Sequence, residues 1–170
     1  MSEEKHNVIL AGFMGTGKTS VGQALARRLG WTFIDADDLI EARAGKVISR
    51  IFAEDGEPAF RALEAEVARE IANRSRHVVA TGGGMVVSQA NRRALEQAGT
   101  LVLLEATPET IWERVKNTTH RPLLAVADPQ ARIRDLLAAR REAYAQVAFQ
   151  VQTDGKSVAA IVDEILKQIQ

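Results

Sequence analysis

The 170-residue sequence predicts an α/β fold of three layers, in which helices flank a central parallel sheet of five strands. Short apolar runs rich in Val, Ile and Leu alternate with longer segments whose apolar residues recur at helical spacing. The first apolar run leads into a glycine-rich loop and then into a helical pattern, the order of a strand–loop–helix unit. Because the length suits one domain and no repeat interrupts the alternation, we expect a single domain over residues 1–170.

The alternation predicts strands near residues 7–11, 32–34, 77–81, 100–105 and 148–152. It predicts helices near residues 18–29, 37–44, 47–54, 57–74, 88–98, 108–115, 130–146 and 157–169. Two of these helix boundaries are also marked by single residues: Gly30 stands where the first helix would end, and Pro58 suits a helix start. In such sheets ligands bind outside the carboxyl ends of the strands, so the segments that follow the strands are expected to face one site.

After the first strand, residues 12–19 read Gly-Phe-Met-Gly-Thr-Gly-Lys-Thr, the G-x-x-x-x-G-K-[ST] pattern of a phosphate-binding loop. A helix that begins at this loop would aim its backbone N–H groups and its dipole at an anion. Lys18 would supply a mobile charge to the β- and γ-phosphates, and Thr19 a hydroxyl to Mg²⁺. The sequence therefore predicts a site for ATP or another nucleoside triphosphate, lined by Gly15, Thr16, Gly17, Lys18, Thr19 and Ser20.

Three carboxylates, Asp35, Asp37 and Asp38, follow the second strand. Mg²⁺ requires hard oxygen ligands, and a second carboxylate can orient or deprotonate a hydroxyl that attacks the γ-phosphate. In an extended chain Asp35 and Asp37 point to the same side, and beside a phosphate loop we favour functional roles for both. We expect one of the three to cap the next helix, and the alternative is that Asp37 or Asp38 does no more than that.

The helical pattern from residue 57 places Arg61 and Glu64 three positions apart, which on its own describes a surface ion pair of small energy. The third strand runs into Gly82, Gly83 and Gly84. Three glycines imply a close approach to the backbone, where a tight turn would need one or two. We favour a ligand that lies against the backbone N–H groups of this triglycine.

The stretch 117–130 has weak periodicity and two prolines, and long loops in compact domains often act as lids. A basic lid would exclude water and stabilise charge on the transferring group; the alternative is a solvated basic loop.

The turn 153–157 after the last strand is a candidate contact for adenine. In the helix that follows the lid, most arginines must face solvent, and one of them is a candidate to reach the site. The arginines of that helix are Arg132, Arg134, Arg140 and Arg141.

Composition excludes several classes of protein. The 22 basic and 22 acidic residues balance, so charge does not indicate a nucleic-acid or membrane surface. The absence of cysteine excludes disulfides, thiolate metal sites and a cysteine nucleophile. With no apolar run long enough for a bilayer and a polar N-terminus unlike a secretory signal, we expect a cytoplasmic protein without nucleic-acid or membrane partners. We also expect a monomer.

Five motifs in this order resemble those of the shikimate kinases, a small P-loop kinase family, over nearly the whole chain. Each motif except the phosphate loop is weak alone, whereas five in the right order are strong. The resemblance implies a P-loop fold with a lid at about 115–130 and a substrate-binding helical segment at about 37–64. The motifs are the loop 12–19, Phe33-Ile34-Asp35-Ala36-Asp37, Phe60-Arg61-x-x-Glu64, Thr81-Gly82-Gly83-Gly84 and Arg121-Pro122-Leu123-Leu124.

The resemblance implies transfer of a phosphoryl group from ATP, with Mg²⁺, to the 3-hydroxyl of shikimate, in the pathway to chorismate and aromatic amino acids. It implies that Asp37 orients this hydroxyl and that Asp35, with Thr19, reaches Mg²⁺. Arg61 and Arg140 would grip the carboxylate of shikimate. The backbone of Gly82, Gly83 and Gly84 would lie against the same substrate.

The resemblance also implies that Arg121 is the lid arginine, that Arg114 lies beside adenine, and that Lys156 belongs to the adenine loop. Arg141 remains open as a competitor of Arg140. The nearest alternative function is a kinase of gluconate or of a nucleotide on the same fold. A nucleotide-dependent switch is disfavoured because no Asn-Lys-x-Asp guanine motif occurs. A binding module without turnover is disfavoured because Lys18, Thr19, Asp35 and Asp37 are all present.

Overall fold

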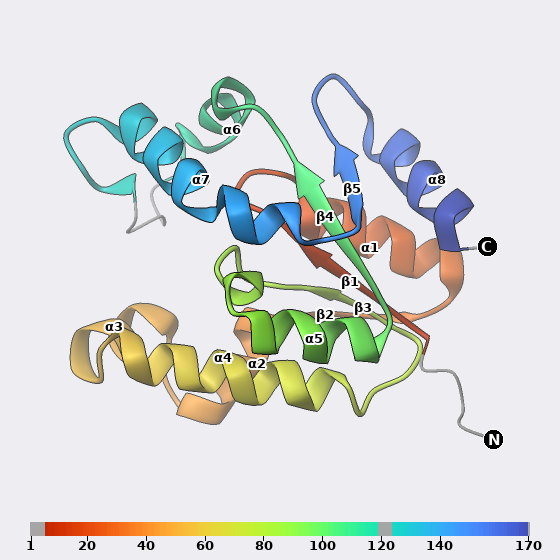
Figure 1. Cartoon of the computed structure of the whole chain (residues 1–170), viewed down its shortest axis with the longest axis horizontal. Helices are drawn as coiled ribbons and strands as arrows, with labels where there is room; N and C mark the ends of the chain where they lie inside the picture. Colours follow the sequence, from red (N-terminus) through yellow and green to blue (C-terminus); the bar gives the residue numbers. More distant parts are fainter. Residues whose placement is uncertain (1–5, 119–123, 170) are drawn as a thin grey trace.

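A computed structural model describes residues 6–118 and 124–169. It has one sheet of five parallel strands in the order β2-β3-β1-β4-β5, which confirms the expected fold class (Figure 1). Each observed strand agrees with its expected range to within one residue at either end. The strands are β1 (Asn7–Ala11), β2 (Thr32–Asp35), β3 (His77–Ala80), β4 (Thr100–Glu105) and β5 (Phe149–Gln152).

Helices cover both faces of the sheet because alternate strand residues point to opposite sides. Val8 and Leu10 of β1 pack with α1 and α8, whereas Ile9 and Ala11 pack on the opposite face with α2 to α7. Both faces of β1 are buried, as expected for a central strand of a parallel sheet. The helices are α1 (Lys18–Leu29), α2 (Ala36–Ala44), α3 (Ile48–Glu54), α4 (Glu57–Ile71), α5 (Gln89–Ala98), α6 (Pro108–Val115), α7 (Pro129–Ala145) and α8 (Val158–Ile169).

Three local expectations need correction. Helix α4 ends at Ile71 and not at residue 74, and a short 3₁₀ helix η1 (Met85–Val87) follows the triglycine, too short for a periodic signal. Helix α2 begins at Ala36, and its cap is Asp35, whose carboxylate accepts a hydrogen bond from the Asp37 N–H. The alternative in which Asp37 or Asp38 caps this helix is therefore wrong. Among the described residues no helix has the length and apolar character needed to cross a membrane.

Candidate active site

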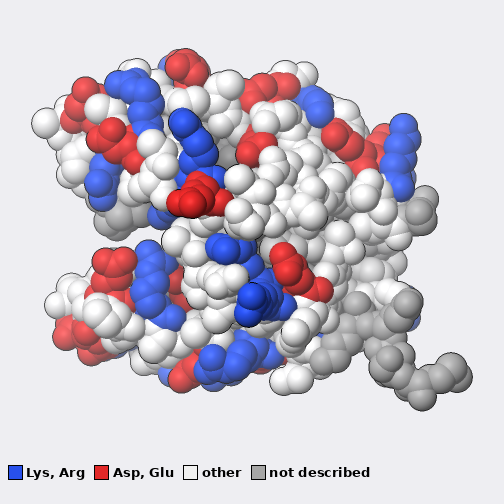
Figure 2. Space-filling model, viewed as in Figure 1, with Lys and Arg blue, Asp and Glu red and all other residues white. Residues whose placement is uncertain are grey.

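A cleft of about 980 Å³ opens at the carboxyl ends of β1, β2 and β3. Its walls come from the phosphate-binding loop, from the segments after β2 and β3, and from α3, α4 and α7. In the space-filling view the molecule is hollowed between α7 and the α3–α4 segment, with side chains of both charges beside the hollow (Figure 2). The structure thus brings the expected segments after the first three strands together, because the strands are parallel and end at one edge of the sheet.

The phosphate-binding loop presents the start of α1 to this cleft. Helix α1 begins at Lys18 and has no acidic residue in its first turn, so the positive end of its dipole is not neutralised within the helix. The Lys18 ammonium donates a hydrogen bond to the Gly12 carbonyl. Gly12 has φ 141°, and a Cβ there would overlap the Leu104 carbonyl of β4, so only glycine fits. The loop is therefore shaped as an anion site by contacts with the sheet.

Asp35 and Asp37 line the cleft together, whereas Asp38 does not line it. Burial and, next, the Asp35 carboxylate raise the pKa of Asp37 to about 6, although Lys18 opposes this shift. Burial also raises the pKa of Asp35 from its ordinary 3.8. A carboxylate with a raised pKa is a better proton acceptor, so Asp37 is suited to take a proton from a hydroxyl near neutral pH.

Arg61 and Glu64 form a partly buried pair and not the surface pair that the spacing alone describes. The Glu64 side chain is only 2% exposed, and its Oε1 lies 2.6 Å from Nη1 of Arg61. Burial raises the pKa of Glu64, and the hydrogen bond from Arg61 opposes the shift. Arg61 is held further by Glu57 at 3.3 Å and lies over the ring of Phe60 at 5.3 Å. The guanidinium is thus fixed at the cleft wall.

Side chains of the protein crowd the triglycine after β3. A Cβ on Gly84 would lie 2.7 Å from Nη1 of Arg61, and one on Gly83 would lie 2.9 Å from Nη1 of Arg140. The φ angles of these glycines lie outside the left-handed region, so the close approach, and not the backbone conformation, demands glycine. The two arginines therefore lie close to the triglycine, and a ligand against its backbone N–H groups stays a prediction.

One row of α7 side chains faces the cleft, at spacings of four residues. Arg132, Leu136 and Arg140 line it, and Tyr144, one turn further, donates a 2.6 Å hydrogen bond to the Gly83 carbonyl. Arg140 also lies over the ring of Phe13 at 5.3 Å. The i, i+4 spacing of this row was the available signal for Arg132 and Tyr144, which sequence reasoning did not assign to the site.

The family model of shikimate kinase matches residues 14–170. The chain belongs to the shikimate kinase family. A shikimate kinase of Geobacter metallireducens is 48% identical, with coverage of 94% of this chain and 89% of that protein. One from Thermodesulfovibrio yellowstonii is 43% identical, with coverage of 95% and 94%.

Solved structures agree with this assignment. A shikimate kinase from Acinetobacter baumannii in complex with shikimate has a TM-score of 0.91 at 38% identity, covering 98% of this chain and 94% of that one. A gluconokinase from Sinorhizobium meliloti 1021 has a TM-score of 0.57 at 20% identity, a likeness that shows the fold alone.

In this member of the shikimate kinase family, most of the residues proposed for the nucleotide lie at the cleft. Thr16 is buried and donates its hydroxyl to the Phe13 carbonyl at 2.8 Å. Lys156 does not line the cleft and pairs with Glu164 at 2.9 Å. Arg121 lies outside the described residues. The cleft-lining members of the predicted nucleotide set are Gly15, Gly17, Lys18, Thr19, Ser20 and Arg114.

Arg114 connects two parts of the expected nucleotide region. Its Nη1 donates to the Gly15 carbonyl at 2.9 Å and to the Thr153 hydroxyl at 3.2 Å. It thereby ties the phosphate-binding loop to the turn after β5, although 99 positions separate Arg114 from Gly15 in the chain. All the residues predicted for the acid substrate also line the cleft: Asp37, Arg61, Gly82, Gly83, Gly84 and Arg140. Arg141 is exposed and does not line it.

Proposed function

We propose that this kinase transfers the γ-phosphoryl group of ATP to the 3-hydroxyl of shikimate, giving shikimate 3-phosphate and ADP. One observation carries the proposal: Arg61 and Arg140 meet at the triglycine beside Asp37, in the same cleft as the phosphate-binding loop. The cleft therefore combines two cations suited to a carboxylate, a basic carboxylate suited to a hydroxyl, and an anion site suited to a triphosphate.

The acid end of the substrate would bind at the triglycine. The fork of a guanidinium matches the two oxygens of a carboxylate, and Arg61 and Arg140 approach Gly84 and Gly83 from different helices. The Glu64 pair and the Tyr144 hydrogen bond to Gly83 hold this end of the cleft in shape. Two arginines at one place favour an acid substrate over a neutral sugar.

The reacting hydroxyl would lie at Asp37. The carboxylate of Asp37 accepts the hydroxyl proton, the hydroxyl oxygen attacks the γ-phosphorus, and the bond from that phosphorus to the β–γ bridging oxygen breaks, releasing ADP. Lys18 stabilises the charge on the phosphates. Catalysis is mostly positioning and electrostatics, because phosphoryl transfer asks for little covalent chemistry.

The residues of the cleft fit Mg²⁺ as a companion of ATP. Thr19 and Asp35 offer hard oxygens at the cleft, and no group of three or more metal-ligating side chains gathers anywhere in residues 6–118 and 124–169. Mg²⁺ suits such a site because it keeps several waters and is bound through one or two protein oxygens together with substrate phosphates. When bound, it would neutralise negative charge on the β- and γ-phosphates.

The lid assigned to about 115–130 and the substrate-binding segment at about 37–64 remain part of the proposal. Arg121, the proposed lid arginine, would stabilise the transferring group once the lid excludes water. We expect the kinase to act as a monomer. We place it in the cytoplasm, where ATP is available.

The proposal is tested by ADP release from the purified protein with ATP and Mg²⁺, with shikimate, gluconate, AMP or no acceptor. Turnover with shikimate alone is expected. Turnover with gluconate instead would support the ATP site but would make gluconate, and not shikimate, the acid substrate. ATP binding without turnover on any acceptor would favour a nucleotide-dependent switch or a binding module.

A further inference from the structure

We propose that Arg132 binds a phosphate group of the nucleotide, as a second cation of α7 placed two turns before Arg140. The inference rests on the proposed function only in taking a nucleoside triphosphate as a substrate. It concerns a residue that none of the five sequence motifs includes.

The position of Arg132 on α7 directs it into the cleft. It shares the cleft-facing row with Leu136 and Arg140 at four-residue spacing. Arg134 and Arg141, on the same helix, are exposed and do not line the cleft. The charge of Arg132 is therefore distinct from the solvated basic face of this helix.

The environment of Arg132 leaves part of its hydrogen-bonding capacity unused. Its Nε is buried without a hydrogen-bond partner among the described residues, as is that of Arg74, but only Arg132 of these two lines the cleft, where an acceptor can reach its guanidinium. In contrast, Arg61 is held by two glutamates and Arg114 by carbonyl and hydroxyl oxygens. A buried donor without an acceptor is costly, so an incoming acceptor would stabilise it.

The helix itself adds to the need for an anion. Arg132 lies in the first turn of α7, where the positive end of the helix dipole disfavours a cation. The carboxylate of Asp128, the residue before the helix, already accepts the Ala131 N–H at 3.1 Å. An anion at this end would meet both the guanidinium and the favourable field of the helix.

Geometry favours a phosphate over the acid end of the substrate. Arg132 is eight residues before Arg140, or roughly 12 Å along the helix. The last part of α7 is tied to the triglycine by the bond from Tyr144 to Gly83, while the first part lies beside α6 (Figure 1). Helix α6 carries Arg114, which donates to Gly15 of the phosphate-binding loop. We infer from this arrangement that Arg132 lies on the nucleotide side of the cleft.

The test compares Arg132→Met with the exposed control Arg134→Met. We would measure the Kd of ATP with Mg²⁺ and of AMP by calorimetry without an acceptor, and the KM of shikimate in turnover. Losing a charged hydrogen bond should raise the Kd of ATP about tenfold or more, with the KM of shikimate changed less than about twofold. An equal rise in the Kd of AMP would assign the contact to the α-phosphate, and an unchanged Kd of AMP would assign it to the β- or γ-phosphate. Arg132→Lys should retain part of the affinity, since it keeps the charge, and Arg134→Met should match the parent protein.

An unchanged Kd of ATP in Arg132→Met would overturn the inference, as would an increase confined to the KM of shikimate, which would move Arg132 to the acid end. If Arg132→Met fails to fold, Arg132→Lys and Arg132→Gln carry the same comparison. Because the binding arm contains no acceptor, it stands apart from the test of shikimate as substrate.

Discussion

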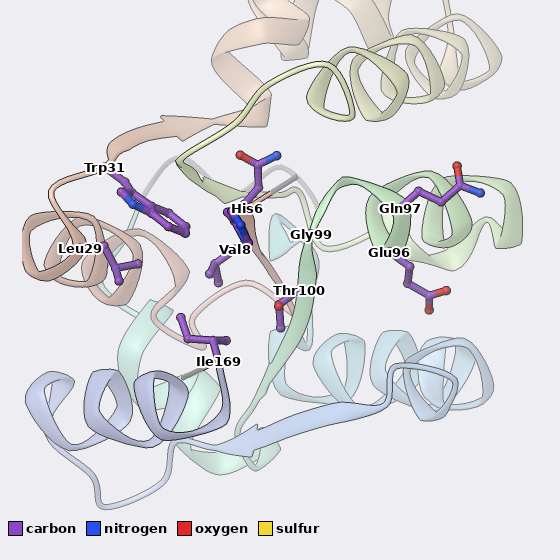
Figure 3. Close-up of a pocket in the computed structure, with 10 residues that line it drawn as sticks. His6, Val8, Leu29, Trp31, Glu96, Gln97, Gly99, Thr100 and Ile169 are labelled. Atoms are coloured by element: carbon purple, nitrogen blue, oxygen red, sulfur yellow. The ribbon is translucent and has the colours of Figure 1, made fainter. Parts of the chain in front are cut away.

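The two ends of the sheet contain hollows of different construction. At the amino ends of the strands, a hollow of about 410 Å³ lies between Trp31, Leu29 and Ile169 on one side and Glu96 and Gln97 of α5 on the other (Figure 3). The cleft at the carboxyl ends has about 980 Å³. Both contain glycine and buried polar groups, so their difference lies in how those groups are used.

At the amino end the polar groups hold the structure together. Asn7 is buried, and its amide donates to the carbonyls of Arg74 and Ala98 at 2.8 Å and accepts the His77 N–H at 3.0 Å. A Cβ on Gly99 would overlap the Asn7 backbone. Every hydrogen-bonding atom of the Asn7 side chain is thus used, and the glycine serves close packing.

At the carboxyl end the polar groups remain reactive. The carboxylates of Asp37 and Glu64 are buried enough to raise their pKa values. Gly83 and Gly84 here lie against the guanidinium groups of Arg140 and Arg61. The same residue types thus stabilise one end of the sheet and, at a cost in stability, prepare the other for chemistry.

The largest expected effect is the loss of phosphoryl transfer in Lys18→Ala. Removing the charge that faces the phosphates should lower kcat on the order of a thousandfold or more, while the fold remains. Coupled ADP release and circular dichroism measure the two properties. Normal turnover in a folded variant would remove Lys18 from the proposed site.

The next effect is that of Asp37→Asn, which should lower kcat roughly 10²- to 10⁴-fold with little change in the Kd of ATP. In the parent protein kcat/KM should fall as the pH drops below about 6, because protonated Asp37 cannot accept the hydroxyl proton. A loss confined to ATP binding would assign Asp37 to the nucleotide.

The same variant should gain stability. The pKa of Asp37 is about 6 in the folded chain against 3.8 ordinarily, so ionisation favours unfolding, and this penalty is complete above pH 6 and absent below pH 3.8. Asp37→Asn should therefore stabilise the fold by up to about 3 kcal/mol at pH 7 and not at pH 3.5. Urea unfolding of both proteins at the two pH values would measure this change in unfolding free energy. An equal change at both pH values would contradict the prediction.

A smaller effect is expected from Arg61→Ala, which removes one of the two cations at the triglycine. The KM of shikimate should rise roughly 10- to 100-fold, since a charged hydrogen bond contributes about 1.5–3 kcal/mol. The variant should also lose stability because Glu64 becomes a buried carboxylate without its partner. Adding Glu64→Gln should restore stability and leave the KM high; an unchanged KM would return Arg61 to a purely structural role.

The smallest and most direct comparison uses one added methyl group at each end. Gly84→Ala should shift the Arg61 guanidinium and raise the KM of shikimate several-fold to about tenfold. The loss of unfolding free energy should be smaller than in Arg61→Ala, because the flexible arginine can move while it still pairs with Glu64. Gly99→Ala should cost about 1–3 kcal/mol of stability and leave the KM unchanged, since its Cβ meets backbone. The reverse pattern would show that the two ends do not differ as described.

Much of this architecture is readable from local pattern. The strands agree with their expected ranges to within one residue, because two-residue and 3.6-residue periodicities and glycine stops depend on near neighbours. The phosphate-binding loop was predicted from its G-x-x-x-x-G-K-[ST] pattern. Its place beside the carboxylates after β2 follows because parallel strands bring their carboxyl ends to one edge.

Contacts between distant segments settle what local pattern leaves open. The burial of Glu64, the choice of Arg140 over Arg141 at the cleft, and the raised pKa of Asp37 all arise where different elements pack together. Spacing along a helix says which side chains share a face, but not which face meets the cleft, and charge states follow from burial that a sequence does not show. The residue types and their order thus define the chemistry available to this chain, whereas packing selects which of those residues carry it out.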